Sequence, residues 1–136
     1  MIPVILHLRT AYLLAHEFHH NTTGCTFKSD HAQFEEHYEA YSEAYDTLVE
    51  RAIGLGLGVN EAVVNKSAAL AAAATRRGRP GNPDDMFKIV LSLENELLDK
   101  IKECYAAASI GTQNTLAQLA DDSERRICKL KGRIGV

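Results

Sequence analysis

Apolar residues recur at every third or fourth position along most of this chain, which is the period of an amphipathic helix. Over residues 3–21 they predict a first helix, with Pro3 suited to its first turn. Its apolar positions are Ile5, Leu8, Tyr12, Ala15 and Phe18, with His19 on the same stripe. The run from Asn21 to Gly24 contains poor helix formers and is expected to end it.

The longest uninterrupted helical pattern begins after Ser29 or Asp30, either of which suits an N-cap, and continues to about Gly54. A helix of about 25 residues is roughly 37 Å long. One stripe of it is apolar and is the expected core face: Phe34, Tyr41, Tyr45, Leu48, Ala52 and Leu55. The glycines at positions 54, 56 and 58 are expected to stop it.

The remaining pattern predicts a short helix and two longer ones. Residues 60–75 are rich in alanine and suit a short helix packed across a bundle, and the TRRGRPGNP segment that follows is typical of an exposed loop. Pro83, followed by two aspartates, opens a helix that we expect to run to about Ser109, where Gly111 ends it. Thr112 begins the last helix. The expected core positions of these two helices are Phe87, Val90, Leu91, Leu97, Leu98, Ile101 and Tyr105, then Leu116, Leu119, Ala120, Ile127 and Leu130.

These elements predict an all-α fold. The chain has 136 residues, and we expect a single domain over residues 1–136. No alternation typical of strands interrupts the helical pattern. Four main helices, with a long connection between the second and the third that contains a short helix, indicate a four-helix bundle with a crossover.

Composition narrows the classes of function. A formal net charge of −3 and a pI near 6.0 argue against a constitutive binder of nucleic acid or of an anionic membrane. The three cysteines are widely spaced and odd in number, which favours a reducing compartment over a disulfide framework. The first apolar run is interrupted by His7 and Arg9 and lacks a basic leader, so we expect neither a signal peptide nor a membrane span. We therefore expect a cytoplasmic protein.

All six histidines fall between residues 7 and 37, which is the first indication of chemistry. His31 and Glu35 are one helical turn apart in the second predicted helix, and so are Asp46 and Glu50, so each pair shares a helix face. Such pairs more often form a solvated surface, but together with His19 they form a register of ligands that favours a metal site. Mixed imidazole and carboxylate ligands suit iron, manganese or zinc.

The two pairs cannot close one site within a single chain. Their midpoints are about 15 residues apart, which corresponds to about 22 Å along a helix. Around the helix axis they differ by only about 60°, so both look out from roughly the same side. If two copies of this helix pack antiparallel about a two-fold axis near residues 38–42, each His31/Glu35 pair meets the other copy's Asp46/Glu50 pair. His19, at the end of the first helix, can join His31.

The order His19, His31, Glu35, Asp46, Glu50 resembles the ferroxidase motif of the Dps family, the mini-ferritins also called DNA-binding proteins from starved cells. The HHNTTG segment is similar to the family's His-Trp-Asn segment, and EEHYEAYSEAYDTLVERAIGLG is similar to its second helix. The segment GTQNTLAQLADDSERRICKLKG is similar to its fourth helix. The resemblance spans nearly the whole chain, and the block between His19 and Glu50 is its specific part.

The resemblance implies a ferritin-like four-helix bundle that assembles as a homo-oligomer, through two-fold dimers, into a hollow dodecamer. It implies catalytic ferroxidase sites in which His19, His31 and Glu35 of one subunit bind metal together with Asp46 and Glu50 of the two-fold partner. Such sites bind Fe(II) and oxidise it with hydrogen peroxide or O2. The ferric product is stored in the cavity, which protects against oxidative stress.

Two positions depart from the family pattern. Glu35 stands where the family usually has Asp, and it is one methylene longer. His20 stands where the family often has Trp, and the chain contains no Trp. His20 and Tyr38 are possible additional residues of the metal site, and the part played by the missing aromatic either falls to Tyr38 or another nearby tyrosine or is absent. His16, one turn earlier, is expected to be packed or hydrogen-bonded rather than a ligand.

DNA binding has little support in the sequence. The basic segments are Arg76, Arg77 and Arg79 in the loop and the KLKGRIGV end, which more often solvate a surface than contact phosphate. Two competing interpretations are a structural or DNA-binding helical oligomer without ferroxidase activity, and an intrasubunit di-iron carboxylate protein. The second needs a Glu-x-x-His on each of two helices, and Glu17 with His20 supplies a single one.

Overall fold

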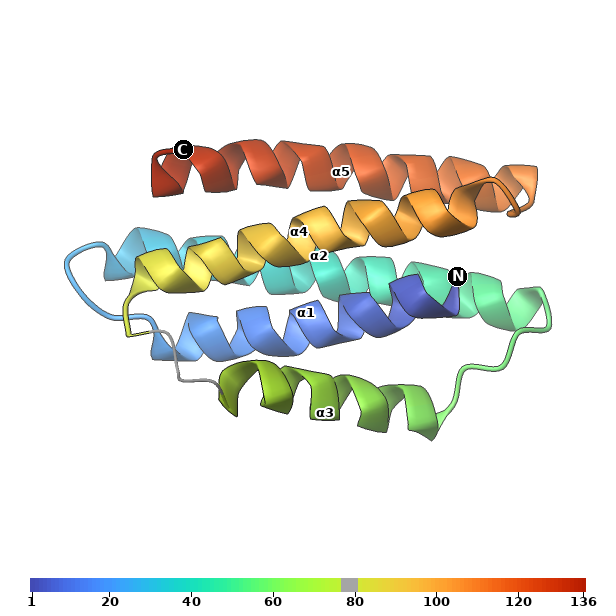
Figure 1. The fold of residues 1–136 in the computed structure, drawn as a ribbon, viewed down its shortest axis with the longest axis horizontal. Helices are drawn as coiled ribbons and strands as arrows, with labels where there is room; N and C mark the ends of the chain where they lie inside the picture. Colours follow the sequence, from blue (N-terminus) through green and yellow to red (C-terminus); the bar gives the residue numbers. More distant parts are fainter. Residues whose placement is uncertain (77–80) are drawn as a thin grey trace.

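Five α-helices make up the part of the chain that the computed structural model describes, residues 1–76 and 81–136. They are α1 (Ile2–Asn21), α2 (Phe27–Gly54), α3 (Glu61–Arg76), α4 (Pro83–Tyr105) and α5 (Ile110–Ile134). α1 packs against α2, α3 and α4, and α4 packs against α5. Figure 1 shows four long helices side by side, with the shorter α3 alongside α1 in the connection from α2 to α4. The predicted all-α four-helix bundle with a crossover is confirmed.

The core is formed by apolar stripes that the helical period predicts. Phe34 of α2 contacts two other rings: its centre lies 5.9 Å from that of Phe18 of α1 and 4.2 Å from that of Phe87 of α4. All three side chains are buried. Burying a side chain of this kind contributes roughly 1.5–3 kcal/mol. These contacts hold α1, α2 and α4 together, and they set the end of α1 against the start of α2, where the clustered histidines lie.

Two residues predicted for the core are exposed instead. Leu55, which is 53% exposed, is the C-cap of α2, and Tyr105, which is 41% exposed, is the last residue of α4. α4 thus ends short of the predicted Ser109. Both residues lie where a helix leaves the bundle, so the apolar stripe continues in the sequence beyond the packed part of the helix.

The start of α2 also differs from the prediction. The helix begins at Phe27 with Thr26 as N-cap, earlier than Ser29 or Asp30. Asp30 is instead buried, and its carboxylate accepts two hydrogen bonds from Arg133 of α5, at 2.9 and 3.0 Å. A residue that suits an N-cap is therefore used to tie α2 to α5.

The last helix begins at Ile110 rather than at Thr112. The Ser109 hydroxyl oxygen accepts a hydrogen bond from the Thr112 N–H, and this N-cap starts the helix early. Gly111 therefore lies in the first turn of α5 and does not separate two helices. An added Cβ at this glycine would come within 3.3 Å of the Arg51 guanidinium, the mobile end of a flexible side chain.

The connection between α2 and α4 is partly described. The alanine-rich segment forms α3, as its pattern predicts. The predicted exposed loop falls partly on residues 77–80, which lie outside the described residues. None of the helices in the described ranges is both long enough and apolar enough to cross a membrane.

Candidate metal centre

Two histidines face each other where the end of α1 meets the start of α2. The rings of His19 and His31 stack with their centres 3.7 Å apart and their planes 24° from parallel. His19 Nδ1 donates a hydrogen bond to the backbone carbonyl of His31 at 2.9 Å, and His31 Nδ1 donates one to the carbonyl of His19 at 2.8 Å. Because a carbonyl oxygen can only accept, each ring carries a proton on Nδ1, and in the neutral tautomer with this bond Nε2 has the lone pair.

This tautomer suits metal binding. Imidazoles that bind metals in proteins usually donate their other N–H to a carbonyl or a carboxylate, which fixes the ring and leaves one nitrogen for the metal. His19 is 8% exposed, so its ring is held within the protein, whereas His31 is half-buried. The chain reverses between the two helices at Gly24, whose φ of 103° lies in the left-handed region that glycine tolerates.

Glu35 follows His31 by one helical turn on the same side of α2. Its side chain is half-buried and lies near that of Tyr38. Burial first, and then the charge of the neighbouring Glu35 carboxylate, raise the pKa of Tyr38. The Tyr38 ring stands edge-on to His19, with ring centres 5.1 Å apart. The predicted first half-site thus has its two histidines in contact, and Tyr38, which contacts His19, lies near Glu35.

Two more histidines extend this group along α1. The ring centres of His16 and His20, one turn apart, are separated by 4.4 Å, and the His20 ring lies 5.2 Å from that of His19. His16 packs against Tyr12 and Tyr38, at ring-centre distances of 5.4 and 4.8 Å. Burial first, and then the adjacent imidazoles, lower the pKa of His16. His20 is exposed.

The second predicted pair lies apart from the first. Asp46 and Glu50 are exposed on α2, and neither forms a hydrogen bond or an ion pair with the described part of the chain. α2 is continuous between the two pairs. Among the residues that the structure describes, no three His, Cys, Asp or Glu side chains converge closely enough to hold a metal ion. A site that uses all five predicted residues therefore requires a second copy of the chain.

Sequence reasoning missed an ionic group in the centre of the bundle. Glu94 of α4 is fully buried. Its carboxylate accepts hydrogen bonds from Tyr41 at 2.7 Å, from Ser123 at 2.6 Å and from Arg126 at 2.6 Å, and His37 Nδ1 lies 3.4 Å away. Burial alone would raise the pKa of Glu94, but the contacts with His37 and Arg126 lower it to about 2. This carboxylate is therefore ionised at neutral pH.

The position of Glu94 was visible in the sequence pattern. It falls in the buried stripe of α4 between Val90 and Leu97, where the helical period predicts an apolar residue. An acid in such a stripe signals a buried partner of opposite charge. Because Glu94 is already paired with the guanidinium of Arg126, the interior of the bundle does not suit the intrasubunit di-iron interpretation.

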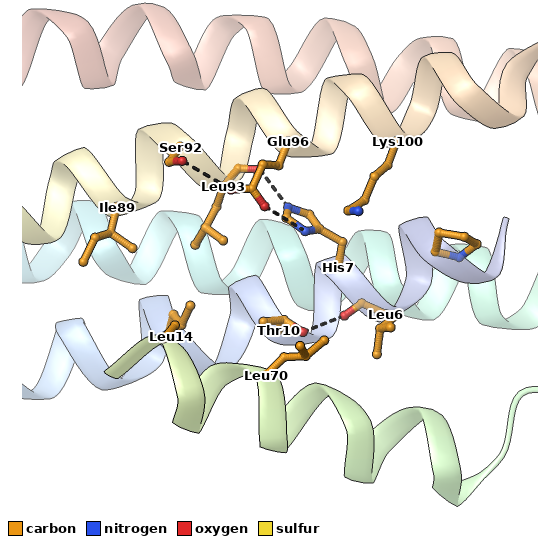
Figure 2. Close-up of a pocket in the computed structure, with 12 residues that line it drawn as sticks. Leu6, His7, Thr10, Leu14, Leu70, Ile89, Ser92, Leu93, Glu96 and Lys100 are labelled. Carbon is orange, nitrogen blue, oxygen red and sulfur yellow. Dashed lines mark hydrogen bonds and ion pairs between the residues drawn. The ribbon is translucent and has the colours of Figure 1, made fainter. Parts of the chain in front are cut away.

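A cavity of about 440 Å³ lies between α1, α3 and α4. Figure 2 shows His7 pointing into the space between α1 and α4, where its Nε2 donates to the Leu93 carbonyl at 2.8 Å and its Nδ1 lies 3.9 Å from Glu96. Burial lowers the pKa of His7, so this ring is neutral at pH 7. None of the five predicted ligands lines the cavity. The group of His16, His19, His20 and His31 therefore lies apart from this cavity, where α1 meets α2.

Comparisons with known proteins cover most of the chain. The sequence model of the ferritin-like domain matches residues 4–133. The DNA protection during starvation protein of Helicobacter pylori strain J99 is 27% identical over 120 residues, which is 87% of this chain and 81% of that protein. Antigen TpF1 of Treponema pallidum strain Nichols and antigen TyF1 of Treponema pallidum subsp. pertenue are each 39% identical over 49 residues. Those matches span 36% of this chain and only 28% of the length of each antigen.

Proposed function

This chain belongs to the ferritin-like family, and on that premise we propose that it is a Dps-like protein that oxidises Fe(II) and stores the ferric product in a homo-oligomeric shell. The observation that carries the proposal is the reciprocal pair of hydrogen bonds between His19 and His31. Each bond occupies Nδ1 and leaves Nε2 as a ligand. Packing alone does not require two adjacent rings to share this arrangement.

The site is completed by a second copy of the chain. His19, His31 and Glu35 form one half, and the partner's Asp46 and the partner's Glu50 form the other. Two α2 helices that pack antiparallel create two identical sites, because a two-fold contact presents the same surface on both chains. The exposure of Asp46 and Glu50, which have no partner within the described residues, supports this arrangement.

Fe(II) is the substrate of the proposed reaction. Neutral imidazoles bind the ion, and the carboxylates stabilise Fe(III) more than Fe(II) because the product carries the higher charge. Each Fe(II) loses one electron and hydrogen peroxide accepts two, so two Fe(II) ions are oxidised for each peroxide reduced to water. Removal of both reactants together suppresses the formation of hydroxyl radicals.

Complementation between two inactive variants tests the shared site. We expect His31→Ala/Glu35→Ala and Asp46→Ala/Glu50→Ala each to lose iron oxidation, measured by the absorbance of the ferric product. In a dimer that contains one chain of each kind, one site combines both intact halves and the other combines both damaged halves. Mixing should therefore restore about half of the activity per mixed dimer.

Glu43→Ala is the matched control, because Glu43 is also an exposed acid on α2 but belongs to neither pair. It should retain full activity. The intersubunit site is wrong if both double variants stay active, or if they lose activity and no mixture recovers it although mixed dimers are present by mass spectrometry.

A further inference from the structure

We propose that His16 and His20 bind a second divalent transition-metal ion, of the Zn(II) or Cu(II) class, separately from the proposed iron site. The two residues lie on one face of α1 because they are one helical turn apart. Two imidazoles at this spacing can chelate one ion from the same helix. Neither belongs to the five-residue set His19, His31, Glu35, Asp46 and Glu50, so the site would be additional to it.

The distance between the rings fits two ligands of one ion. The ring centres of His16 and His20 are 4.4 Å apart, and the planes are inclined at 59°. With Zn–N bonds of about 2.0–2.1 Å, two imidazoles on one ion hold their ring centres roughly 4.5–5.2 Å apart, for angles at the metal between about 90° and the tetrahedral value. The separation of the two ring centres is therefore already close to what chelation needs.

One ring of the pair is held in place and the other is free to close on the ion. His16 is half-buried, stacked on Tyr12 at 5.4 Å and edge-on to Tyr38 at 4.8 Å. His20 is exposed. Neither imidazole forms a hydrogen bond with the described part of the chain, so binding an ion breaks none there. Fixing one ligand in advance lowers the ordering cost of binding.

The end of α1 also favours a cation. His20 lies in the last turn of the helix, which ends at Asn21. The aligned peptide dipoles of a helix leave partial negative charge at its C-terminus, which stabilises a positive ion within the last turn. No Lys or Arg occupies this turn, whose basic residues are His19 and His20. A bound divalent ion would supply the positive charge.

The chemistry of the two ligands selects the metal. An imidazole pair without a carboxylate suits Zn(II), Ni(II) and Cu(II) better than Fe(II), because affinity for nitrogen ligands rises along the first transition row to copper. The mixed imidazole and carboxylate set around His31 and Glu35 suits iron. Two neighbouring groups of histidines on one face would thus hold different metals.

Metal titration in a chain without the proposed iron site tests the inference. The full-length background is His19→Ala/His31→Ala/Glu35→Ala/Asp46→Ala/Glu50→Ala, and the probes are Zn(II) in calorimetry and Cu(II) in electron paramagnetic resonance. We expect about one Zn(II) per chain, and a Cu(II) spectrum with nitrogen splittings. Adding His16→Gln/His20→Gln should lower the Zn(II) affinity at least tenfold and remove the nitrogen splittings.

A second variant keeps the number of histidines constant. His20→Gln/Asn21→His moves one imidazole to the next position, which is turned by about 100° around the helix and no longer faces His16. It should bind Zn(II) as weakly as His16→Gln/His20→Gln. Helix content and native mass should match those of the background. The inference is wrong if the background binds no Zn(II), or if either variant binds it as tightly as the background.

The outcome is independent of the proposed iron chemistry. Iron oxidation is absent from the background by design, so the titration does not depend on it. Conversely, wild-type protein that lacks iron oxidation but binds one Zn(II) per chain through His16 and His20 would contradict the proposed function and support this site.

Discussion

Glu94 is the residue whose environment differs most from what its chemical type suggests. A carboxylate with no exposed surface would normally be protonated, because burial penalises the charge. Here Arg126 approaches it through two nitrogens, at 2.6 and 3.3 Å, while Tyr41 and Ser123 donate to its oxygens. The same contacts link α2, α4 and α5. Charge and packing at the centre of the bundle therefore depend on one side chain.

Replacing Glu94 tests that dependence. Glu94→Gln leaves the largely buried Arg126 without its counter-charge, and removing one partner of a buried pair costs about 3–5 kcal/mol. We expect the free energy of unfolding, measured by urea denaturation, to fall by that amount. Glu103→Gln changes an exposed acid on the same helix and should alter it by less than about 0.5 kcal/mol. Equal effects of the two changes would contradict the structural role of Glu94.

The pH dependence of stability follows from the same residue. The pKa of Glu94 is about 2 in the folded chain against 4.5 for the free group, so the folded state favours the ionised form. The stabilisation is fully present above pH 4.5 and is lost as the pH falls from 4.5 toward 2. Wild-type protein should therefore lose more stability than Glu94→Gln across this interval, measured by urea denaturation at each pH. Parallel curves for the two proteins would argue against an ionised Glu94.

At the scale of elements, the hairpin of α1 and α2 positions the candidate site. The two helices meet at the His19–His31 contact, and the five-residue connection that starts after Asn21 contains Gly24 with a φ of 103°. A wider turn would separate the two carbonyls from the ring nitrogens that bond to them. The tautomer of the histidines is thus coupled to the backbone path of the turn.

Gly24→Ala tests that coupling. A side chain in the left-handed region costs roughly 1–2 kcal/mol, and the strain is relieved by opening the turn. We expect lower stability in urea denaturation and slower iron oxidation, because the two imidazoles lose their alignment. Gly58→Ala is the control, since Gly58 has no positive φ and an added Cβ meets nothing within 4 Å. If the two variants behave alike, the turn does not hold the site.

α5 shows how the basic residues near the end of the chain are used. Arg126 pairs with Glu94, and Arg133 contacts both Asp30 and Asp84. The pKa of Arg133 is raised, chiefly by its hydrogen bonds with Asp30. These guanidinium groups hold helices together.

At the scale of the whole molecule, apolar residues remain exposed at one end of the bundle. Leu55 and Leu57 follow α2, and Ile110 starts α5; they are 53%, 42% and 86% exposed. Figure 1 places the end of α2 and the turn between α4 and α5 at the same end of the bundle. Exposed apolar side chains gathered at one end of a molecule are typical of a contact between proteins. In the proposed shell, a second copy of the chain would cover these apolar residues.

Native mass tests assembly through this end. A closed shell of twelve 15.0 kDa chains would have a mass of about 180 kDa by native mass spectrometry. We expect Ile110→Glu to shift the population to smaller species, because it buries a charge in a subunit contact. Val136→Glu, at a residue 77% exposed, should leave the mass unchanged. A wild-type mass no larger than a dimer would contradict storage in a shell.

The sequence by itself determined the architecture, because helical period and helix breakers are local properties. It predicted the long helix that contains Phe34 and Leu48, the crossover with its short helix, and the ferritin-like resemblance, which the family match over residues 4–133 confirms. It also determined that His31 and Asp46 cannot meet within one helix, since the rise per residue fixes their separation. Their meeting across two chains stays a prediction.

Only the tertiary structure decided which atoms of the site are available. The free Nε2 of His19 depends on a carbonyl twelve positions later, and the charge of Glu94 depends on a guanidinium from another helix. The start of α5 likewise depends on the Ser109 cap. Periodicity assigns a residue to a face of its helix. A hydrogen bond, however, requires a donor–acceptor distance that is correct to within a few tenths of an ångström, between segments that only folding brings together. His19 and His31 could therefore be chosen from the sequence, whereas their orientation toward a metal could not.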